Sequence, residues 1–176
     1  MTRLVIDNTC LSHFARAGRL DLLDLITDGY DRSTTEEVMI EIVDGVADHP
    51  ALGQLVGVQW FSIVELNLRE TVHAAKIKAE LGGDPTRDLG ECAVIAVAAS
   101  RLGVAVIDDQ EAAAVGRRHG VTVVGTLAVI AAALKRGIID RTTAESLVDE
   151  LAVTDMRLPV DGGGLVAWCY ANSLLP

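Results

Sequence analysis

Short β-branched runs alternate with helical patterns along this chain, which restricts the fold to very few classes. The runs are LVI at 4–6, VAVI at 104–107 and VTVV at 121–124. Helical patterns follow them at roughly 9–18, 110–119 and 126–136. Continuous apolar strands of this kind are typical of a parallel sheet buried on both faces. The sequence therefore predicts an α/β fold, a three-layer α/β/α sandwich with a central parallel sheet.

Other segments complete this predicted architecture. Two capping boxes, Thr34-x-x-Glu37 and Thr142-x-x-Glu145, predict the starts of further helices. Helices are also expected near 67–82 and 89–102, and 58–64 is either another strand or a buried connection. Gly103, Gly120 and Gly137 are expected to mark helix ends.

The length of 176 residues is that of one ordinary domain. We expect this domain to span 1–155, with a tail at 156–176 that packs on the domain or on a dimer partner. Half of the residues are hydrophobic but only 3% are aromatic, so the core must consist of Ala, Val, Leu and Ile.

Several classes of protein are disfavoured by what the sequence lacks. The first residues, MTRLVIDN, do not resemble a signal peptide, and the longest apolar runs are too short to span a bilayer, so we expect a cytoplasmic protein without a membrane partner. Cys10, Cys92 and Cys169 are far apart and odd in number, which indicates reduced core residues. The four histidines show no zinc-ligand spacing.

The net charge of −10 is unfavourable for a nucleic-acid partner, because phosphate binding normally requires a basic surface. Local basic clusters remain at Arg117-Arg118-His119 with Arg101 and at Lys135-Arg136. Each cluster is either a local binding patch or a solvated helix end.

Acidic residues follow the predicted strands. Asp7 comes directly after the first run and Asp108-Asp109 after the second, while Gly125-Thr126 follows the third. The carboxyl ends of parallel strands meet at the edge where ligands of such sheets bind. Asp7 could also be a helix N-cap, and so could one of the adjacent pair, but two neighbouring acids repel each other unless a cation lies beside them.

Two more acids occupy apolar helical patterns. Glu91 lies on the same helical stripe as Ile95, Ala98 and Leu102, and Asp88 with Glu91 could also form a capping box. Glu41 lies at the margin of an apolar helix face. Carboxylates that share a pocket can stay ionised if a divalent cation compensates their charge, and oxygen ligands alone suit Mg²⁺ or Mn²⁺. The chemistry indicated is metal-dependent hydrolysis of a phosphodiester.

The segments LVIDNTCLS, EEVMIEIV, DLGECAVIAVA and VAVIDDQEAAAVGRRHGVTVVGTLAVI resemble, in this order, the PIN-domain nucleases. They look most like the VapC-like toxin ribonucleases with a G-E pair in the third motif and a G-T-L segment after the last strand. The resemblance covers roughly 3–151. It implies an α/β/α sandwich, cleavage of RNA with Mg²⁺ or Mn²⁺, a small antitoxin partner and a homodimer.

The resemblance also implies residue roles. Asp7, Glu41, Glu91 and Asp109 match the four family acids and are the catalytic candidates. Asp7, Glu91 and Asp109 are the metal candidates, with Asp108 as an auxiliary acid. The polar positions after the first acid are matched by Asn8 and Thr9.

Two features depart from the family pattern. Ile107 occupies a position where the family often has Ser or Thr, so a supporting hydroxyl is missing, and the tail from Pro159 onward has no counterpart. The alternative to a nuclease is a catalytically inactive PIN-like module that binds RNA or a protein. Phosphatases of the haloacid dehalogenase type are disfavoured because Thr9 replaces the second Asp of their first motif, and a receiver domain because IDNT supplies one acid only.

Overall fold

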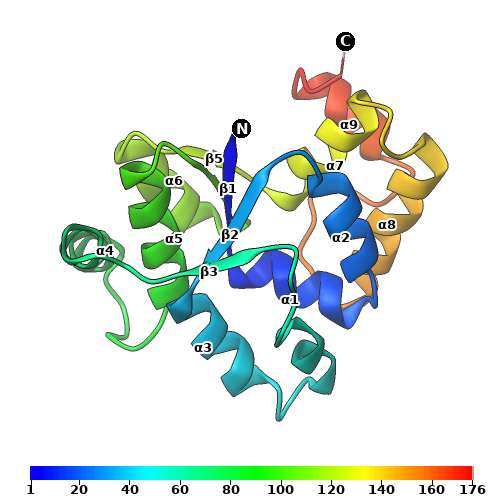
Figure 1. The fold of residues 1–176 in the computed structure, drawn as a ribbon. Helices are drawn as coiled ribbons and strands as arrows, with labels where there is room; N and C mark the ends of the chain where they lie inside the picture. Colours follow the sequence, from blue (N-terminus) through cyan, green and yellow to red (C-terminus); the bar gives the residue numbers. More distant parts are fainter. Residues whose placement is uncertain (176) are drawn as a thin grey trace.

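A five-stranded parallel sheet forms the centre of residues 1–175, the part of the chain that the computed structural model describes (Figure 1). The strands are β1 (Arg3–Ile6), β2 (Asp31–Thr35), β3 (Ser62–Val64), β4 (Val104–Val106) and β5 (Thr122–Val124). Their order is β3-β2-β1-β4-β5, and every neighbouring pair is parallel. The predicted α/β class with a parallel sheet is therefore confirmed.

Helices flank the sheet on both sides (Figure 1). One side carries α4 (Leu68–Leu81), α5 (Leu89–Ser100) and α6 (Gln110–Arg118), and the other carries α1 (Asn8–Arg16), α2 (Leu20–Thr27), α7 (Thr126–Lys135) and α8 (Arg141–Val153). The helix α3 (Glu36–Gly45) and the 3₁₀ helix η1 (Pro50–Leu55) lie near the end at which β1 and β2 finish, and α9 (Leu165–Ala171) packs on α8.

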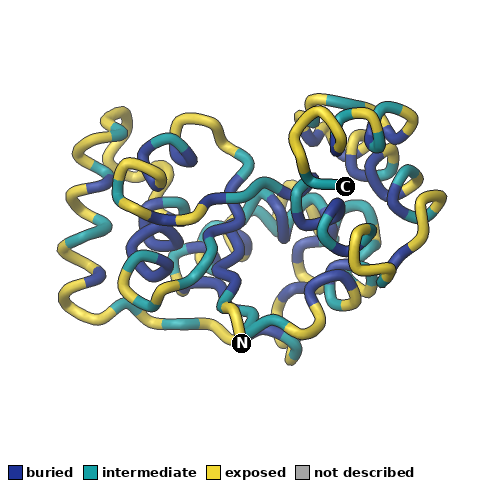
Figure 2. The backbone as a smooth tube through the Cα atoms, turned by 90° about the horizontal axis from the view of Figure 1, so that it is seen from above, coloured by how far each residue is buried: buried dark blue, intermediate teal, exposed yellow. Residues whose placement is uncertain are grey.

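The core is centred on β1 and α5. All residues of α5 from Cys92 to Ala98 are buried, because the helix lies between the sheet and α4. A helix that is covered on both sides has no solvated face, which explains why this segment is apolar all round. In Figure 2 the outer turns are mostly exposed and the centre is mostly buried. Leu102 does not continue the stripe of Glu91, because it lies beyond the end of α5 and is 92% exposed.

The central strand β2 was not predicted, because its sequence, DRSTT, is polar. Its buried hydroxyls form hydrogen bonds with the neighbouring strand β1: Ser33 Oγ donates to the Leu4 carbonyl over 3.3 Å, and Thr34 Oγ1 donates to the Ile6 carbonyl over 2.7 Å. Thr34 therefore belongs to β2, and the predicted capping box is wrong by one residue. Thr35 is the N-cap of α3, and its side chain accepts from Val38 N.

The second capping box is also wrong. Asp140, two residues before Thr142, caps α8 by accepting from Thr143 N over 2.7 Å. The short helices α2 and α9 were not predicted either. The segment expected at 58–64 forms only the short edge strand β3.

Gly120 and Gly137 end their helices with positive φ angles, as predicted, whereas at the end of α5 this conformation is adopted by Leu102 instead of Gly103. All three cysteines are buried and free, as predicted. None of the helices in the described part of the chain combines the length and apolar character that crossing a bilayer requires.

Candidate active site

Asp7 is the most deeply buried acid at the carboxyl edge of the sheet. It follows β1, is 1% exposed, and caps α1 by accepting from Thr9 N through Oδ2 over 3.2 Å. Its other oxygen, Oδ1, is buried without any hydrogen-bond partner in the described structure. Burial, and then the negative charge of Glu91, raises the pKa of Asp7 well above its usual value. The N-cap interpretation is correct, but it accounts for only one of the two oxygens.

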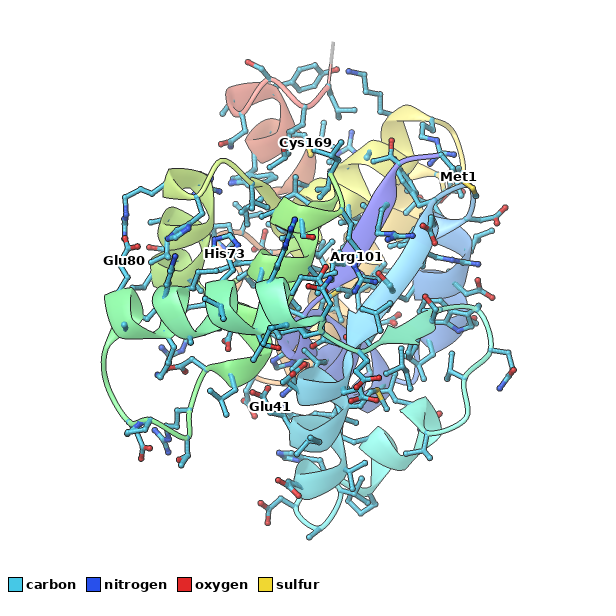
Figure 3. The ribbon with its side chains drawn as sticks, turned by 60° about the vertical axis from the view of Figure 1, so that its left-hand side comes forward. Met1, Glu41, His73, Glu80, Arg101 and Cys169 are labelled. Carbon is cyan, nitrogen blue, oxygen red and sulfur yellow. The ribbon has the colours of Figure 1, made fainter. Side chains whose placement is uncertain are left out.

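Glu41 projects from α3 toward the start of α5 and is labelled in Figure 3. Its Oε1 accepts from Gly90 N over 2.9 Å and its Oε2 accepts from Asn8 Nδ2 over 3.2 Å. A Cβ atom at position 90 would lie 2.8 Å from Oε2, so only glycine leaves room for this carboxylate. Gly90 thus allows α3, α5 and the start of α1 to converge on one side chain.

Glu91 lies in the first turn of α5. Burial, and then the negative charges of Glu41, Asp88 and Asp109, raise its pKa to about 7 against the lowering effect of a backbone hydrogen bond. Glu41 and Glu91 also contribute to the raised pKa of Asp7. The four predicted acids are therefore one electrostatic group, although they come from four distant segments of the chain.

The adjacent acids Asp108 and Asp109 have different surroundings. Asp109 is exposed and caps α6 through one oxygen, which accepts from Ala112 N over 2.8 Å. Asp108 is half-buried, and its two oxygens accept from Thr126 N over 2.8 Å and from Thr126 Oγ1 over 2.6 Å. Asp108 therefore joins the end of β4 to the start of α7, whereas the charge of Asp109 acts on Glu91.

Thr126 supplies a hydroxyl that sequence reasoning did not anticipate. Ile107 has no hydroxyl, but the hydroxyl of Thr126 donates a hydrogen bond to Asp108, the residue that follows Ile107. A Cβ atom at Gly125 would lie 2.9 Å from Asp108 Oδ1. Gly125 therefore leaves space for this carboxylate, and Thr126 donates hydrogen bonds to it. The position of this pair directly after a strand was the signal available in the sequence.

Glu37 is a further acid whose importance the sequence did not indicate. Its Oε2 atom is buried without a hydrogen-bond partner in the described structure. It lies one turn before Glu41 on α3, and its charge contributes to the raised pKa of Glu41. From the sequence it was assigned only to a capping box.

A pocket of about 600 Å³ opens beside Asp108 and Asp109. Its lining includes Asp108, Asp109 and Thr9 from the sheet edge, together with His13 and Arg157. His13 is held by a 2.6 Å hydrogen bond to Thr154 Oγ1, and burial lowers its pKa. The edge of the sheet thus presents acids beside an open pocket, as expected for a ligand site of a parallel sheet.

A family model described as PIN domain matches residues 3–161, which is most of the chain. The chain belongs to the PIN-domain family. A search of the curated proteins found no match to this PIN domain.

PIN domains generally use divalent metal ions. Within residues 1–175 no three His, Cys, Asp or Glu side chains lie close enough to ligate one ion together. The donor chemistry nevertheless fits, because every candidate ligand is a carboxylate and Asp7 Oδ1 has no hydrogen-bond partner among the described residues. A cation among Asp7, Glu91 and Asp109 would offset the repulsion that raises the pKa values of Asp7 and Glu91.

Two interpretations of charged residues need correction in this PIN domain. Asp88 precedes α5 but has a φ of 58° and forms no capping hydrogen bond; its carboxylate pairs with Lys78 Nζ at 3.2 Å. The basic cluster is also divided, because Arg101 pairs with Glu70 and Arg118 pairs with Glu80. Arg117 faces a separate groove.

Proposed function

We propose that this PIN domain is an endoribonuclease that hydrolyses RNA phosphodiester bonds with Mg²⁺ or Mn²⁺. The observation that carries the proposal is the buried Asp7 Oδ1 atom, which has no partner among the described residues, beside Glu91 and Glu41, whose charges raise the pKa of Asp7. A buried carboxylate oxygen without a partner has a large desolvation cost, and a cation removes that cost.

Each acid would have a distinct task. Asp7, Glu91 and Asp109 would hold the cation, with Asp108 as an auxiliary acid fixed by Thr126. Glu41 positions Asn8 and the first turn of α5 through its two hydrogen bonds. A divalent cation, when bound, supplies a water of lowered pKa and neutralises charge on the phosphate oxygens.

The decisive experiment is cleavage of single-stranded RNA in the presence of Mn²⁺. We expect wild type to cleave and Asp7→Asn to lose activity by about 100-fold or more, because several kcal/mol of charge stabilisation depend on that carboxylate. Asp21→Asn, which changes an exposed acid in the first turn of α2, is the matched control and should keep activity.

The contrary result is equally clear. If wild type neither cleaves RNA nor binds Mn²⁺ at millimolar concentration by calorimetry, the nuclease proposal fails. The chain would then be a catalytically inactive module that binds RNA or a protein.

We also propose that the protein is a VapC-like toxin restrained by a small antitoxin protein. Support comes from family membership and from the Gly90-Glu91 pair. In this pair Gly90 leaves room for the Glu41 carboxylate. Induced expression in a bacterium should arrest growth with wild type but not with Asp7→Asn. Equal growth of both strains would contradict the toxin role.

A homodimer is the assembly we propose. Ile40, Val43 and Ile63 are each more than half exposed and line one shallow apolar depression formed by α3 and the edge strand β3. Apolar patches of this kind commonly mark protein interfaces. Light scattering after size exclusion should give twice the chain mass for wild type and a monomer for Ile40→Glu; a monomeric wild type would contradict the proposal.

A further inference from the structure

A second pocket, of about 810 Å³, lies between the α6–β5–α7 region and the C-terminal segment. We call it the tail groove, and the residues on which its chemistry depends are Gln110, Arg117, Arg157, Trp168 and Asn172. None of these residues was a candidate for the site at the sheet edge.

The tail groove adjoins the pocket beside Asp108 and Asp109. Asp108, Gln110 and Arg157 line both the tail groove and that pocket. A chain-like ligand in the tail groove would therefore reach the part of the sheet edge where Asp108 and Asp109 lie.

The two arginines of the groove differ from most others in this acidic chain. Ion pairs with carboxylates engage these arginines: Arg3, Arg16, Arg19, Arg32, Arg101, Arg118 and Arg141. Within residues 1–175, neither Arg117 nor Arg157 forms such a pair, and both are exposed. The only hydrogen bond of the Arg117 guanidinium in this part of the chain is a 3.4 Å contact with the Val123 carbonyl. Two guanidiniums are thus available to bind anions in one groove of a protein with net charge −10.

Trp168 provides an aromatic surface in the same groove. It lies on α9, whose Leu165 and Cys169 are fully buried, so the helix is anchored on its inner face while Trp168 stays partly exposed. Asn172 lies one turn later and donates from Nδ2 to the Trp168 carbonyl over 2.8 Å.

The segment before α9 is held tightly against α8. Gly162 N donates to Asp149 Oδ1 over 2.7 Å, and a Cβ atom at Gly162 would lie only 2.2 Å from the Glu145 carbonyl oxygen. Only glycine permits this approach. The position of Trp168 is therefore fixed by packing, as a preformed binding surface requires.

Guanidiniums that bind phosphates and an indole on which a base stacks are the usual elements of single-strand recognition. A duplex would not expose a base face to Trp168. Building on the nuclease function proposed above, we propose that the tail groove binds single-stranded RNA next to the scissile phosphate, with a base stacked on Trp168 and phosphates against Arg117 and Arg157.

The test measures binding separately from cleavage. In the Asp7→Asn background with EDTA, fluorescence anisotropy gives the Kd of a labelled ten-nucleotide RNA. We expect Trp168→Ala to weaken binding by about 5- to 100-fold, the range for loss of one stacked base, and Arg117→Gln and Arg157→Gln to weaken it with a reduced salt dependence. Arg69→Gln is the matched control, because Arg69 is exposed at the start of α4 and does not line the groove.

Trp168 also reports on stacking directly. In Trp60→Phe the tail tryptophan is the only one left, because the chain has two tryptophans. RNA should quench its fluorescence, and Trp168→Phe should retain more affinity than Trp168→Ala because it keeps an aromatic face.

The outcomes separate this inference from the proposed catalysis. Groove-dependent binding without Mn²⁺-dependent cleavage by wild type would support the tail groove and overturn the nuclease proposal. Cleavage by wild type, with groove variants that bind and cleave like Arg69→Gln, would overturn the tail groove and leave the nuclease proposal intact. Should Trp168→Ala fail to fold by circular dichroism, the two arginine variants still decide the question.

Discussion

At the scale of single residues, two glycines provide the space that two of the site's carboxylates occupy. Gly90 and Gly125 each leave a space that a carboxylate fills, that of Glu41 in one case and that of Asp108 in the other. Neither carboxylate could keep its backbone hydrogen bond if a Cβ atom occupied that space. Small residues beside charged ones are therefore part of the chemistry of this site.

Gly90→Ala should separate activity from stability. The new Cβ would lie 2.8 Å from Glu41 Oε2, and because this carboxylate ends a flexible side chain it would move away. We expect RNA cleavage to fall by about tenfold, roughly one lost hydrogen bond, while the free energy of unfolding changes by about 1 kcal/mol or less. Gly53→Ala, which meets nothing within 4 Å, is the control. Unchanged cleavage in Gly90→Ala would show that the position of Glu41 does not matter.

At the scale of secondary-structure elements, one buried ion pair joins α4 to the end of α5. The two oxygens of Glu70 accept from Arg101 Nε and Nη2, both over 2.8 Å, and Glu70 Oε2 also accepts from Asn67 N in the capping box of α4. The Glu70 carboxylate is fully buried, whereas the Arg101 side chain is 26% exposed. This pair replaces apolar packing at the point where α5 returns to the sheet.

Glu70→Gln should destabilise the protein in a pH-dependent way. The Arg101 guanidinium holds the pKa of Glu70 near 2, below the usual 4.5, so the stabilisation is complete above about pH 4.5 and is lost as the pH falls toward 2. Urea denaturation at pH 7 should show a loss of about 2–3 kcal/mol, because Arg101 is left without a counterion, and a smaller difference at pH 3.

Glu145→Gln is the control for this variant, since its partner Arg141 is 66% exposed and the pair should contribute less than about 1 kcal/mol. A pH-independent effect of Glu70→Gln would mean that the ion pair is not the cause of its stabilisation.

At the scale of the whole molecule, four acids from four segments are held together against their mutual repulsion by the apolar core. Burial and repulsion raise the pKa values of Asp7 and Glu91. Between the usual and the raised pKa values, these two acids therefore bind more protons in the folded protein than in the unfolded chain. These acids therefore make a pH-dependent contribution to the stability of the metal-free protein.

The sign of this dependence can be tested. Because the pKa of Glu91 rises from 4.5 to about 7, Glu91 should destabilise the metal-free protein increasingly as the pH increases from about 4.5 to 7. In EDTA at pH 7.5, Glu91→Gln should be more stable than wild type by about 1–3 kcal/mol, and nearly equal to it at pH 4.5. Glu65→Gln, an exposed change, should show neither effect.

Mn²⁺ should reverse the order of stability of wild type and Glu91→Gln. A cation present at 100 times its Kd stabilises the folded state by about 2.7 kcal/mol, and Glu91→Gln should gain less because it lacks one ligand. Equal stability of wild type and Glu91→Gln in EDTA at pH 7.5 would contradict this explanation of the raised pKa of Glu91.

The sequence alone determined the fold class and the strands β1, β4 and β5, because continuous β-branched runs have few alternative interpretations. The order of its motifs also identified Asp7, Glu41, Glu91 and Asp109, whose roles remain predictions. Only the tertiary structure revealed β2, since the hydroxyls of Ser33 and Thr34 are satisfied by carbonyls of β1, a partner that sequence does not name. The tertiary structure likewise decided that Thr126 binds Asp108 and that the C-terminal segment forms a groove beside it. Local patterns report how one segment meets solvent, whereas these contacts depend on distances between segments far apart in the chain.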